Sequence, residues 1–214
     1  MTAITPQVLL RAYAAGVFPM AESASDPALY WIEPDERGII PLDGFHISRS
    51  LAKRVRHRTY DIRIDTCFAD VIKACATPTE ARKETWINNR IISLYTQLHK
   101  IGCAHSVESW QNGELVGGLY GVRIGSVFFG ESMFSRATDA SKVALVHLVA
   151  RLKFGGFTLL DAQFQNDHLQ QFGTVTLGKK QYHQKLEAAI EQDADFFAFK
   201  NDDDPFQVLD LATG

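Results

Sequence analysis

The segment Ala104-His-Ser-Val-Glu-Ser-Trp-Gln-Asn-Gly-Glu-Leu-Val-Gly-Gly-Leu-Tyr-Gly-Val122 contains the clearest signal for the fold of this chain. Two β-prone runs flank Asn112-Gly113, which is the strongest short-range signal for a hairpin, because both turn positions need a left-handed backbone that Asn and Gly tolerate. A third run, residues 126–133, follows directly after Gly125. The segment therefore predicts three consecutive strands in one meander.

Beyond the meander, the pattern changes to a helix and then to another buried strand. Apolar residues at helical spacing predict a helix over residues 141–154, which Gly155-Gly156 ends, and a strand follows from Phe157. This order of elements makes a mixed α/β sheet and is that of the acyl-transferring, acetyltransferase-like (GNAT-type) fold. We expect this domain to cover residues 46–214.

The two ends of the chain are less regular. We expect residues 1–45 to form a small N-terminal subdomain, in which residues 38–41 make a brief edge strand beside turn residues. The acidic tail, with Asp193, Asp195 and residues 202–204, is expected to be loose.

Composition and charge are those of a soluble globular protein. The 214 residues are 46% hydrophobic and 22% charged, with a net charge of −3, so nucleic-acid binding would need a local basic patch. Cys67, Cys75 and Cys103 form no C-x-x-C pair, which indicates free thiols in a reducing compartment. No apolar run approaches the roughly 20 residues of a membrane span, and Arg11 interrupts the one candidate signal segment. We therefore expect a cytoplasmic protein without membrane contact.

Polar side chains lie at the end of the strand within residues 157–168, Phe-Thr-Leu-Leu-Asp-Ala-Gln-Phe-Gln-Asn-Asp-His. Because successive side chains of a strand point to opposite faces, Asp161 and Gln163 share one face, about 7 Å apart along the chain. A carboxylate beside an amide suggests a reaction centre. The same spacing is equally compatible with the solvated face of an edge strand.

A further carboxylate lies in the third strand of the meander. Strand alternation predicts that Phe129, Glu131 and Met133 share one face, so that Glu131 lies between apolar neighbours. Burying an unpaired carboxylate costs several kcal/mol. Glu131 therefore either has a partner, such as Arg136 or a backbone amide, or recognises a positively charged group of a substrate.

A basic helix is predicted from residue 48 to about residue 58. Three of its cations recur at i, i+4 and i+7 on one face, and two more flank that face: Arg49, Lys53, Arg56, Arg54 and Arg58. Few acidic residues lie nearby in the sequence, so the pattern is compatible with phosphate binding as well as with an ordinary solvated face.

Several common catalytic arrangements are absent from the sequence. No H-x-x-x-H, C-x-x-C or H-x-H spacing assembles a metal site, so we expect no metal. There is no G-x-x-x-x-G-K-[ST] loop for ATP and no G-x-S-x-G turn for a serine nucleophile. CoA-dependent acetyltransferases hold pyrophosphate on a glycine-rich turn, whereas residues 134–142 contain no glycine here. We therefore expect an acyl donor other than CoA, and no cofactor.

Seven short motifs, in order over roughly residues 8–190, resemble those of the bacterial leucyl/phenylalanyl-tRNA–protein transferases. They are Gly16-Val-Phe-Pro, Phe45-His-Ile-Ser-Arg-Ser50, Thr85-Trp-Ile, Gly117-Gly-Leu-Tyr-Gly-Val122, Phe129-Gly-Glu-Ser-Met-Phe-Ser-Arg136, Leu160-Asp-Ala-Gln163 and Asn166-Asp-His168. The resemblance implies transfer of Leu or Phe, and less efficiently Met, from aminoacyl-tRNA to proteins with N-terminal Arg or Lys. The product is then a degradation signal in the N-end rule pathway, and the enzyme is cytosolic, independent of ATP and metal, and usually monomeric.

The resemblance also assigns residues to roles. It implies that Asp161 and Gln163 are the catalytic pair, and our hypothesis is that Asp161 orients Gln163 and receives proton density from the amine. Which group takes the proton stays open. Glu131 matches a pocket residue that would hold a cationic group, and the apolar pocket for Leu and Phe would contain Trp86, Leu119, Phe129 and Phe134. The cations of the basic helix would bind tRNA phosphates.

One departure from the family concerns the adenosine platform. Members often carry Phe-Pro-Trp where this chain has Phe18-Pro19-Met20, so Met20 could replace the expected aromatic stack only in part. Three alternatives remain. A sibling transferase would place Leu on N-terminal Asp or Glu, although Glu131 would repel such an acceptor. The others are a CoA-dependent N-acetyltransferase and a non-catalytic RNA-binding module.

Overall fold

The computed structural model describes residues 4–79, 83–200 and 204–214. Its strands are β1 (Phe18–Met20), β2 (Tyr30–Ile32), β3 (Glu36–Ile40), β4 (Asp61–Ile64), β5 (Ala104–Gln111), β6 (Glu114–Ile124), β7 (Val127–Ser135), β8 (Leu159–Gln163) and β9 (Val175–Gly178). Its helices are α1 (Pro6–Ala14), α2 (Arg49–Arg56), α3 (Phe68–Ala76), α4 (Asn89–Lys100), α5 (Ala140–Phe154), α6 (Asp167–Gln170), α7 (Lys179–Ile190) and α8 (Pro205–Thr213).

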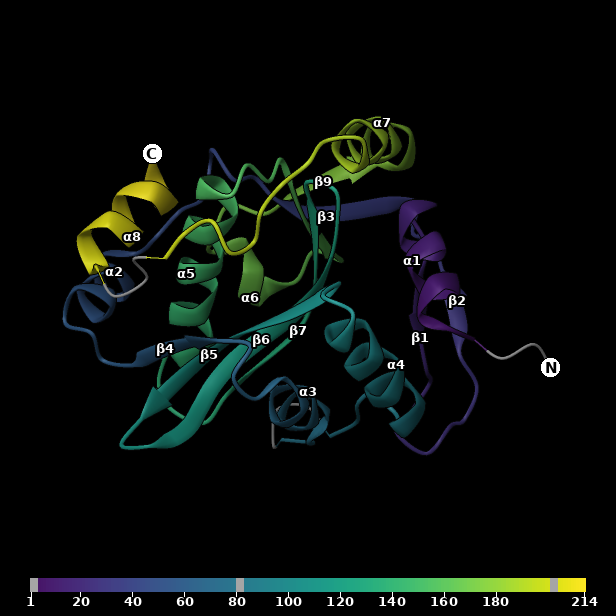
Figure 1. Cartoon of the computed structure of the whole chain (residues 1–214), viewed down its shortest axis with the longest axis horizontal. Helices are drawn as coiled ribbons and strands as arrows, with labels where there is room; N and C mark the ends of the chain where they lie inside the picture. Colours follow the sequence, from purple (N-terminus) through teal and green to yellow (C-terminus); the bar gives the residue numbers. More distant parts are fainter. Residues whose placement is uncertain (1–3, 80–82, 201–203) are drawn as a thin grey trace.

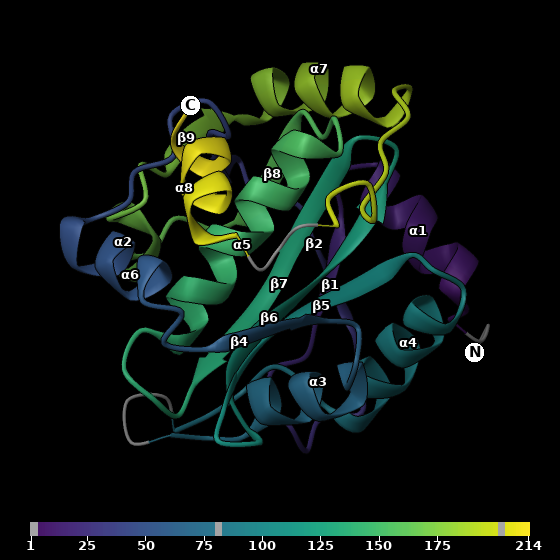
Figure 2. The same ribbon diagram turned by 60° about the vertical axis from the view of Figure 1, so that its left-hand side comes forward.

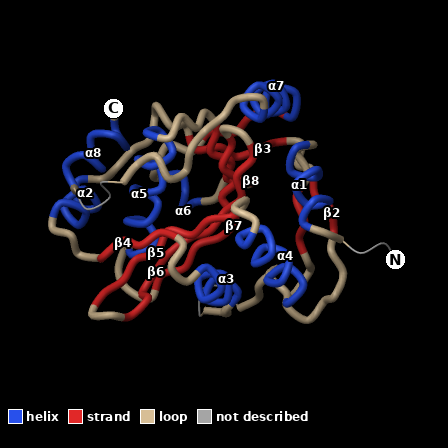
Figure 3. The backbone as a smooth tube through the Cα atoms, in the orientation of Figure 1, coloured by secondary structure: helices blue, strands red, loops and turns tan. Residues whose placement is uncertain are grey.

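In the described part of the chain, one sheet of seven strands runs in the order β4-β5-β6-β7-β8-β3-β9, and β1 pairs with β2 in a separate ribbon. Figure 3 shows this sheet as a continuous red band through the middle of the molecule. All its pairs are antiparallel except β7 with β8. The expectation of a mixed α/β sheet is therefore confirmed, with mostly antiparallel pairing.

The predicted meander forms as β5, β6 and β7. Asn112 and Gly113 connect β5 to β6 with positive φ values of 53° and 80°, the conformation that the hairpin turn requires. Helix α5 then returns the chain so that β8 lies parallel to β7. The strands β7 and β8 consequently run in the same direction side by side, which brings two polar positions, Glu131 and Gln163, close together.

Two groups of helices cover the two faces of the sheet, as Figure 1 and Figure 2 show. Helices α2, α5 and α8 contribute to one hydrophobic core, and α1, α3, α4 and α7 contribute to the other. We call these the α5 face and the α4 face. None of the helices in the described ranges is long and apolar enough to cross a membrane.

A β-bulge changes the side-chain alternation of β7. Tyr120 pairs with Ser132 and Gly121 pairs with Gly130, so Glu131 is an extra residue between the two pairs. Gly121 permits the bulge, because a Cβ there would overlap the carbonyl oxygen of Phe129. The expectation that Met133 shares a face with Glu131 is wrong. Met133 packs in the core of the α5 face.

The N-terminal strands differ from the sequence expectation in two ways. Strand β3 lies between β8 and β9 and is not an edge strand. The error has a physical cause, since its pairing partners lie more than a hundred residues away and leave no local signal. The apolar segment Phe18–Met20 is a strand paired with β2. The proposed division at residue 45 stays a prediction, although β3 in the first part belongs to the main sheet.

The C-terminal tail is also more ordered than expected. Asp204 caps α8 by accepting hydrogen bonds from the backbone of Phe206 and Gln207, and Val208 and Leu209 are buried against the α5 face. The expectation of a loose tail is therefore wrong for residues 204–214. Asp202 and Asp203 lie outside the described residues.

Candidate active site

Three polar side chains predicted from the sequence meet on the α4 face. Asp161 and Gln163 lie near the end of β8, and Glu131 lies at the bulge of the neighbouring strand β7. Asp161 is fully buried and Glu131 is 9% exposed. Helices α1, α4 and α7 each place a tyrosine over this group. The alternative of a solvated edge strand is thus excluded, because β8 is an interior strand and its carboxylate is covered.

Asp161 forms a buried ion pair with Arg37 of β3. The guanidinium Nε donates to Oδ1 at 3.0 Å and Nη2 donates to Oδ2 at 2.6 Å. The Tyr182 hydroxyl of α7 donates to Oδ2 at 2.7 Å. A buried carboxylate needs such partners, because an isolated charge in an apolar environment is strongly disfavoured.

Arg37 is itself tied to three further groups. Its Nη1 donates to the carbonyl oxygen of Gly16 at 3.0 Å, and its guanidinium carbon lies 4.5 Å from the ring centre of Phe18 and 4.7 Å from that of Tyr182. Burial lowers the pKa of Arg37, but the hydrogen bonds and charge of Asp161 outweigh this effect, so that the pKa is raised from its ordinary value. Arg37 is 1% exposed and remains a cation in the interior.

Gln163 has a left-handed backbone with φ of 62°, which is unfavourable for a residue with a side chain. Asp161 supports this conformation, because its Oδ1 accepts from the Gln163 backbone N–H at 2.7 Å. Gly38 of β3 permits the turn to pack closely, since a Cβ there would lie 2.8 Å from the backbone of Phe164 and Gln165. Asp161 therefore orients Gln163 through the backbone and leaves the side-chain amide free to point elsewhere.

The Gln163 amide points to Glu131, donating from Nε2 to Oε1 at 2.9 Å. Tyr13 donates to the same oxygen at 2.6 Å, and Tyr95 donates to Oε2 at 3.1 Å. The two phenol oxygens also contact each other. The partners of Glu131 are thus phenols and an amide, and the expected partner Arg136 instead contacts the Leu115 carbonyl and the Phe134 ring.

Burial raises the pKa of Glu131 to about 7, although hydrogen bonds from Tyr13, Tyr95 and Gln163 act in the opposite direction. The negative charge of Asp161 adds to the increase. Burial, followed by the charge of Glu131, raises the pKa values of Tyr13 and Tyr95 as well. Both phenols therefore stay protonated near neutral pH and act as donors, whereas Glu131 changes its protonation state there.

The predicted apolar pocket is divided by the sheet. Phe129 and Phe134 are buried in the core of the α4 face, and Trp86 and Met20 are partly buried against it. Phe129 is beside the polar group, with its ring centre 4.8 Å from that of Tyr13. Leu119, in contrast, packs in the core of the α5 face, so the structure does not bring it together with the others.

Four residues of this arrangement were not predicted from the sequence: Arg37, Tyr13, Tyr95 and Tyr182. The tyrosines occupy apolar positions of amphipathic helices, where a phenol that donates into a site cannot be told from a core ring. Arg37 did leave a weak signal. It is a lone cation directly before the apolar run Gly38-Ile39-Ile40, and a buried cation requires a carboxylate partner.

The predicted basic helix α2 lies on the α5 face, away from Glu131. Its apolar residues Leu51 and Val55 are buried, while Arg49, Lys53 and Arg56 are exposed, as the helical spacing indicated. Arg54 is paired with Asp139, from Nε to Oδ2 at 2.8 Å.

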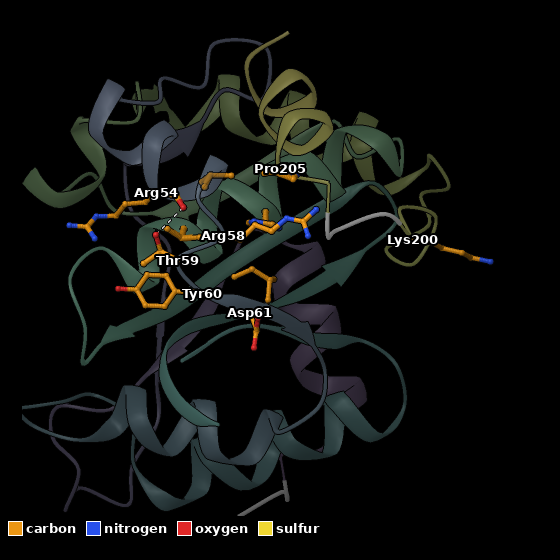
Figure 4. Close-up of a pocket in the computed structure, with 11 residues that line it drawn as sticks. Arg54, Arg58, Thr59, Tyr60, Asp61, Lys200 and Pro205 are labelled. Carbon is orange, nitrogen blue, oxygen red and sulfur yellow. Dashed lines mark hydrogen bonds between the residues drawn. The ribbon is translucent and has the colours of Figure 1, made fainter. Parts of the chain in front are cut away.

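A cavity of about 290 Å³ adjoins the C-terminal end of α2. Arg54, Arg58 and Lys200 line it together with the buried His147, and Figure 4 shows Arg54 and Lys200 extending in opposite directions.

Among the described residues, no group of three His, Cys, Asp or Glu side chains is arranged to hold a metal ion. The polar group on the α4 face offers proton-transfer and hydrogen-bonding chemistry.

The sequence is similar to that of known proteins over most of its length. A family model described as leucyl/phenylalanyl-tRNA protein transferase matches residues 39–187, and the model of the N-terminal domain of the same family matches residues 2–35. Leucyl/phenylalanyl-tRNA–protein transferases from Rhodospirillum rubrum and Rhodopseudomonas palustris (strain BisB18) are each 58% identical. The alignment with the first relative covers 92% of this chain and 92% of that relative. The alignment with the second covers 90% of this chain and 84% of that relative. The enzyme of that name from Afipia carboxidovorans is 56% identical, over 93% of this chain and 88% of its own length. The chain therefore belongs to the leucyl/phenylalanyl-tRNA–protein transferase family.

Proposed function

We propose that this protein transfers Leu or Phe, and less efficiently Met, from aminoacyl-tRNA to the α-amino group of proteins that begin with Arg or Lys. Membership of the family supports the transfer reaction. The observation that carries the choice of acceptor is Glu131, a carboxylate on the α4 face that has no ion-pair partner within 4 Å among the described residues. A carboxylate without an ion pair, close to where the acceptor's α-amino group would bind, favours a cationic side chain on the acceptor and disfavours an acidic one.

The catalytic pair in this proposal is Gln163 and Asp161. Attack of an amine on an ester is already favourable, so that the enzyme must mainly orient the two reactants and stabilise the developing oxyanion. Gln163 is suited to position the amine or the carbonyl, because its amide lies beside Glu131. Asp161 acts through Gln163, whose left-handed turn it supports by accepting the backbone N–H. Arg37 in turn holds Asp161.

The aminoacyl side chain would bind against apolar groups of the α4 face. Trp86 and Met20, which are partly exposed, would contribute to this surface, while Phe129 and Phe134 are buried in the core of the same face. Leu119 is left out because it packs on the opposite face. An apolar pocket distinguishes side chains by about 1–3 kcal/mol per methylene, which explains preference for Leu and Phe with some acceptance of Met.

The tRNA body would bind to α2 through its exposed cations. Although α2 lies on the α5 face, the segment after β8 connects the two regions. Phe45, just before α2, stacks on Phe172 with ring centres 5.3 Å apart, and Phe172 follows α6, which begins four residues after Gln163. The acceptor end could therefore pass over α6 to reach Gln163, while Arg49 and Lys53 contact phosphates.

The arrangement of β5, β6, β7, α5 and β8 supports an acetyltransferase-like fold, but the N-terminus of α5 argues against CoA. The backbone N–H of Ser141 donates to the Ser135 hydroxyl at 2.9 Å, and that of Ala140 donates to the Ala137 carbonyl at 3.1 Å. Amides that are already bonded within the protein cannot hold a pyrophosphate.

We further propose that the enzyme acts in the cytoplasm as a monomer without a cofactor, and that its products are degradation signals of the N-end rule pathway. The cysteines support a reducing compartment, because Cys67 and Cys103 are free thiols. No step of the proposed transfer requires a redox group or ATP, since the ester bond of aminoacyl-tRNA is already activated.

The proposed acceptor specificity can be tested with charged leucyl- and phenylalanyl-tRNA and a panel of peptides that begin with Arg, Lys, Asp or Glu. We expect labelling of the Arg and Lys peptides only, measured by transfer of radioactive amino acid. Labelling confined to the acidic peptides would identify the sibling specificity. Binding of CoA by calorimetry without any transfer would indicate an acetyltransferase, and binding of tRNA regardless of its aminoacyl group, again without transfer, would indicate an RNA-binding module.

For the catalytic pair, Asp161→Ala and Gln163→Ala should each reduce kcat by about 10²-fold or more, the scale seen when a positioned polar group is removed. Steady-state transfer at saturating tRNA and peptide measures the effect. A suitable control is Gln165→Ala, because Gln165 follows the turn and bonds the exposed Thr176. Unchanged turnover in both site variants would remove the pair from the mechanism.

For tRNA binding, the double variant Arg49→Ala and Lys53→Ala should weaken affinity and reduce the slope of log K against log salt by up to about two, because each phosphate contact releases about one counterion. Filter binding over a range of salt concentrations gives the slope. The matched control, Arg90→Ala with Lys100→Ala, removes the same charge from exposed positions of α4. An unchanged slope in the α2 variant alone would place the tRNA elsewhere.

For the positioning ion pair, Arg37→Met should lower the free energy of unfolding by about 3–5 kcal/mol, because it leaves the buried Asp161 charge without its cation. Arg54→Met is the matched control. Its ion pair with Asp139 is 35% and 21% exposed, so we expect a loss of no more than about 1 kcal/mol. Urea denaturation followed by fluorescence compares the two, and equal losses would contradict the structural role assigned to Arg37.

A further inference from the structure

The two carboxylates of the site have different surroundings, although they lie on one face of the sheet. Asp161 has no exposed surface, and its two oxygens accept from Arg37, Tyr182 and the backbone N–H of Gln163. A carboxylate offers about four lone-pair positions. These are occupied by donors that favour the charged form, and one of the donors is a permanent cation. Asp161 therefore has no open acceptor position for a substrate amine.

Glu131 is the opposite case. Its three donors, Tyr13, Tyr95 and the Gln163 amide, are all neutral, and two of them occupy Oε1 while one occupies Oε2. One acceptor position on Oε2 thus has no donor among the residues that the structure describes, and Glu131 is 9% exposed. A substrate amine that binds beside Gln163 could reach this position directly.

The charged and titratable groups around Glu131 come from five elements. Tyr13 of α1 and Tyr95 of α4 donate to it, and Asp161 of β8 lies beyond Gln163, with Arg37 of β3 and Tyr182 of α7 next to Asp161. Burial and the Asp161 charge raise the pKa of Glu131 to about 7 against its three hydrogen bonds. An α-amino group has a pKa of about 7.7–8.0, so that proton exchange between the two groups is nearly balanced.

We propose that Glu131, and not Asp161, takes the proton from the α-ammonium group of the acceptor protein. This inference rests on the proposed function and assigns the proton transfer within the same site. It follows the general pattern in which two carboxylates with different environments divide the roles of electrostatic support and proton exchange.

The Glu131 carboxylate takes one proton from the α-ammonium, and the resulting amine forms a C–N bond with the ester carbonyl carbon, while Gln163 holds one of the reacting groups. The bond from this carbon to the tRNA ribose oxygen then breaks. The leaving oxygen takes a second proton from the former amine, the third stays on the new amide, and the proton on Glu131 passes to solvent.

Glu131→Gln tests the assignment, because it keeps the shape of the side chain and removes the basic oxygen. At pH 7, with saturating Arg-peptide and leucyl-tRNA, we expect the single-turnover rate to fall by about 10²-fold or more. The rate of the variant should then rise with pH, because the α-ammonium loses its proton to solvent without help from the enzyme. The wild-type rate should level off above about pH 7. If Glu131 only held a cation, KM for the peptide would rise and the limiting rate would be unchanged, which would overturn the proposal.

A second pair of variants keeps the test decisive if Glu131→Gln does not fold. Tyr95→Phe removes a donor that stabilises the Glu131 carboxylate, so the acid limb of the pH–rate profile should move to higher pH. Tyr182→Phe removes a comparable donor from Asp161 and should leave the limb in place. The reverse result would assign the proton to Asp161. Absence of transfer by the wild-type protein would instead contradict the proposed function itself.

Discussion

The site depends on the buried ion pair between Arg37 and Asp161. Two charges in an apolar interior cost more than they return unless their geometry is good and their remaining hydrogen-bonding groups are satisfied. Here the guanidinium bonds both oxygens of Asp161 and the carbonyl of Gly16, and it lies between the rings of Phe18 and Tyr182. The pair therefore joins the turn after α1, strands β3 and β8, and helix α7 around one point.

The ion pair is linked to the reactive groups through the backbone of Gln163. Asp161 supports the left-handed turn at Gln163, and that turn directs the amide to Glu131 on the neighbouring strand. The bulge in β7 has a comparable effect, because the extra residue is Glu131 itself. Two local departures from regular strand geometry thus place an amide and a weakly solvated carboxylate side by side, as expected where function requires strain.

Much of the architecture was accessible from local patterns. The Asn112-Gly113 hairpin and the helix now seen as α5 follow from turn chemistry and side-chain periodicity. The wrong predictions concern strands whose position or side-chain direction depends on pairing with residues far away in the sequence. Strand β3 is interior because residues far along the chain flank it, and the bulge reverses the alternation that would have put Met133 beside Glu131.

The sequence by itself determined the family, the meander, the two carboxylates and the basic helix, because motifs, turns and periodicity are encoded in residues close together in the chain. Only the tertiary structure decided that Arg37 and Tyr182 surround Asp161, that phenols surround Glu131, and that α2 and Leu119 belong to the other face. The physical reason is that burial and hydrogen-bond partners are properties of the packed interior. The same carboxylate is an inert anchor or a proton acceptor according to which side chains enclose it.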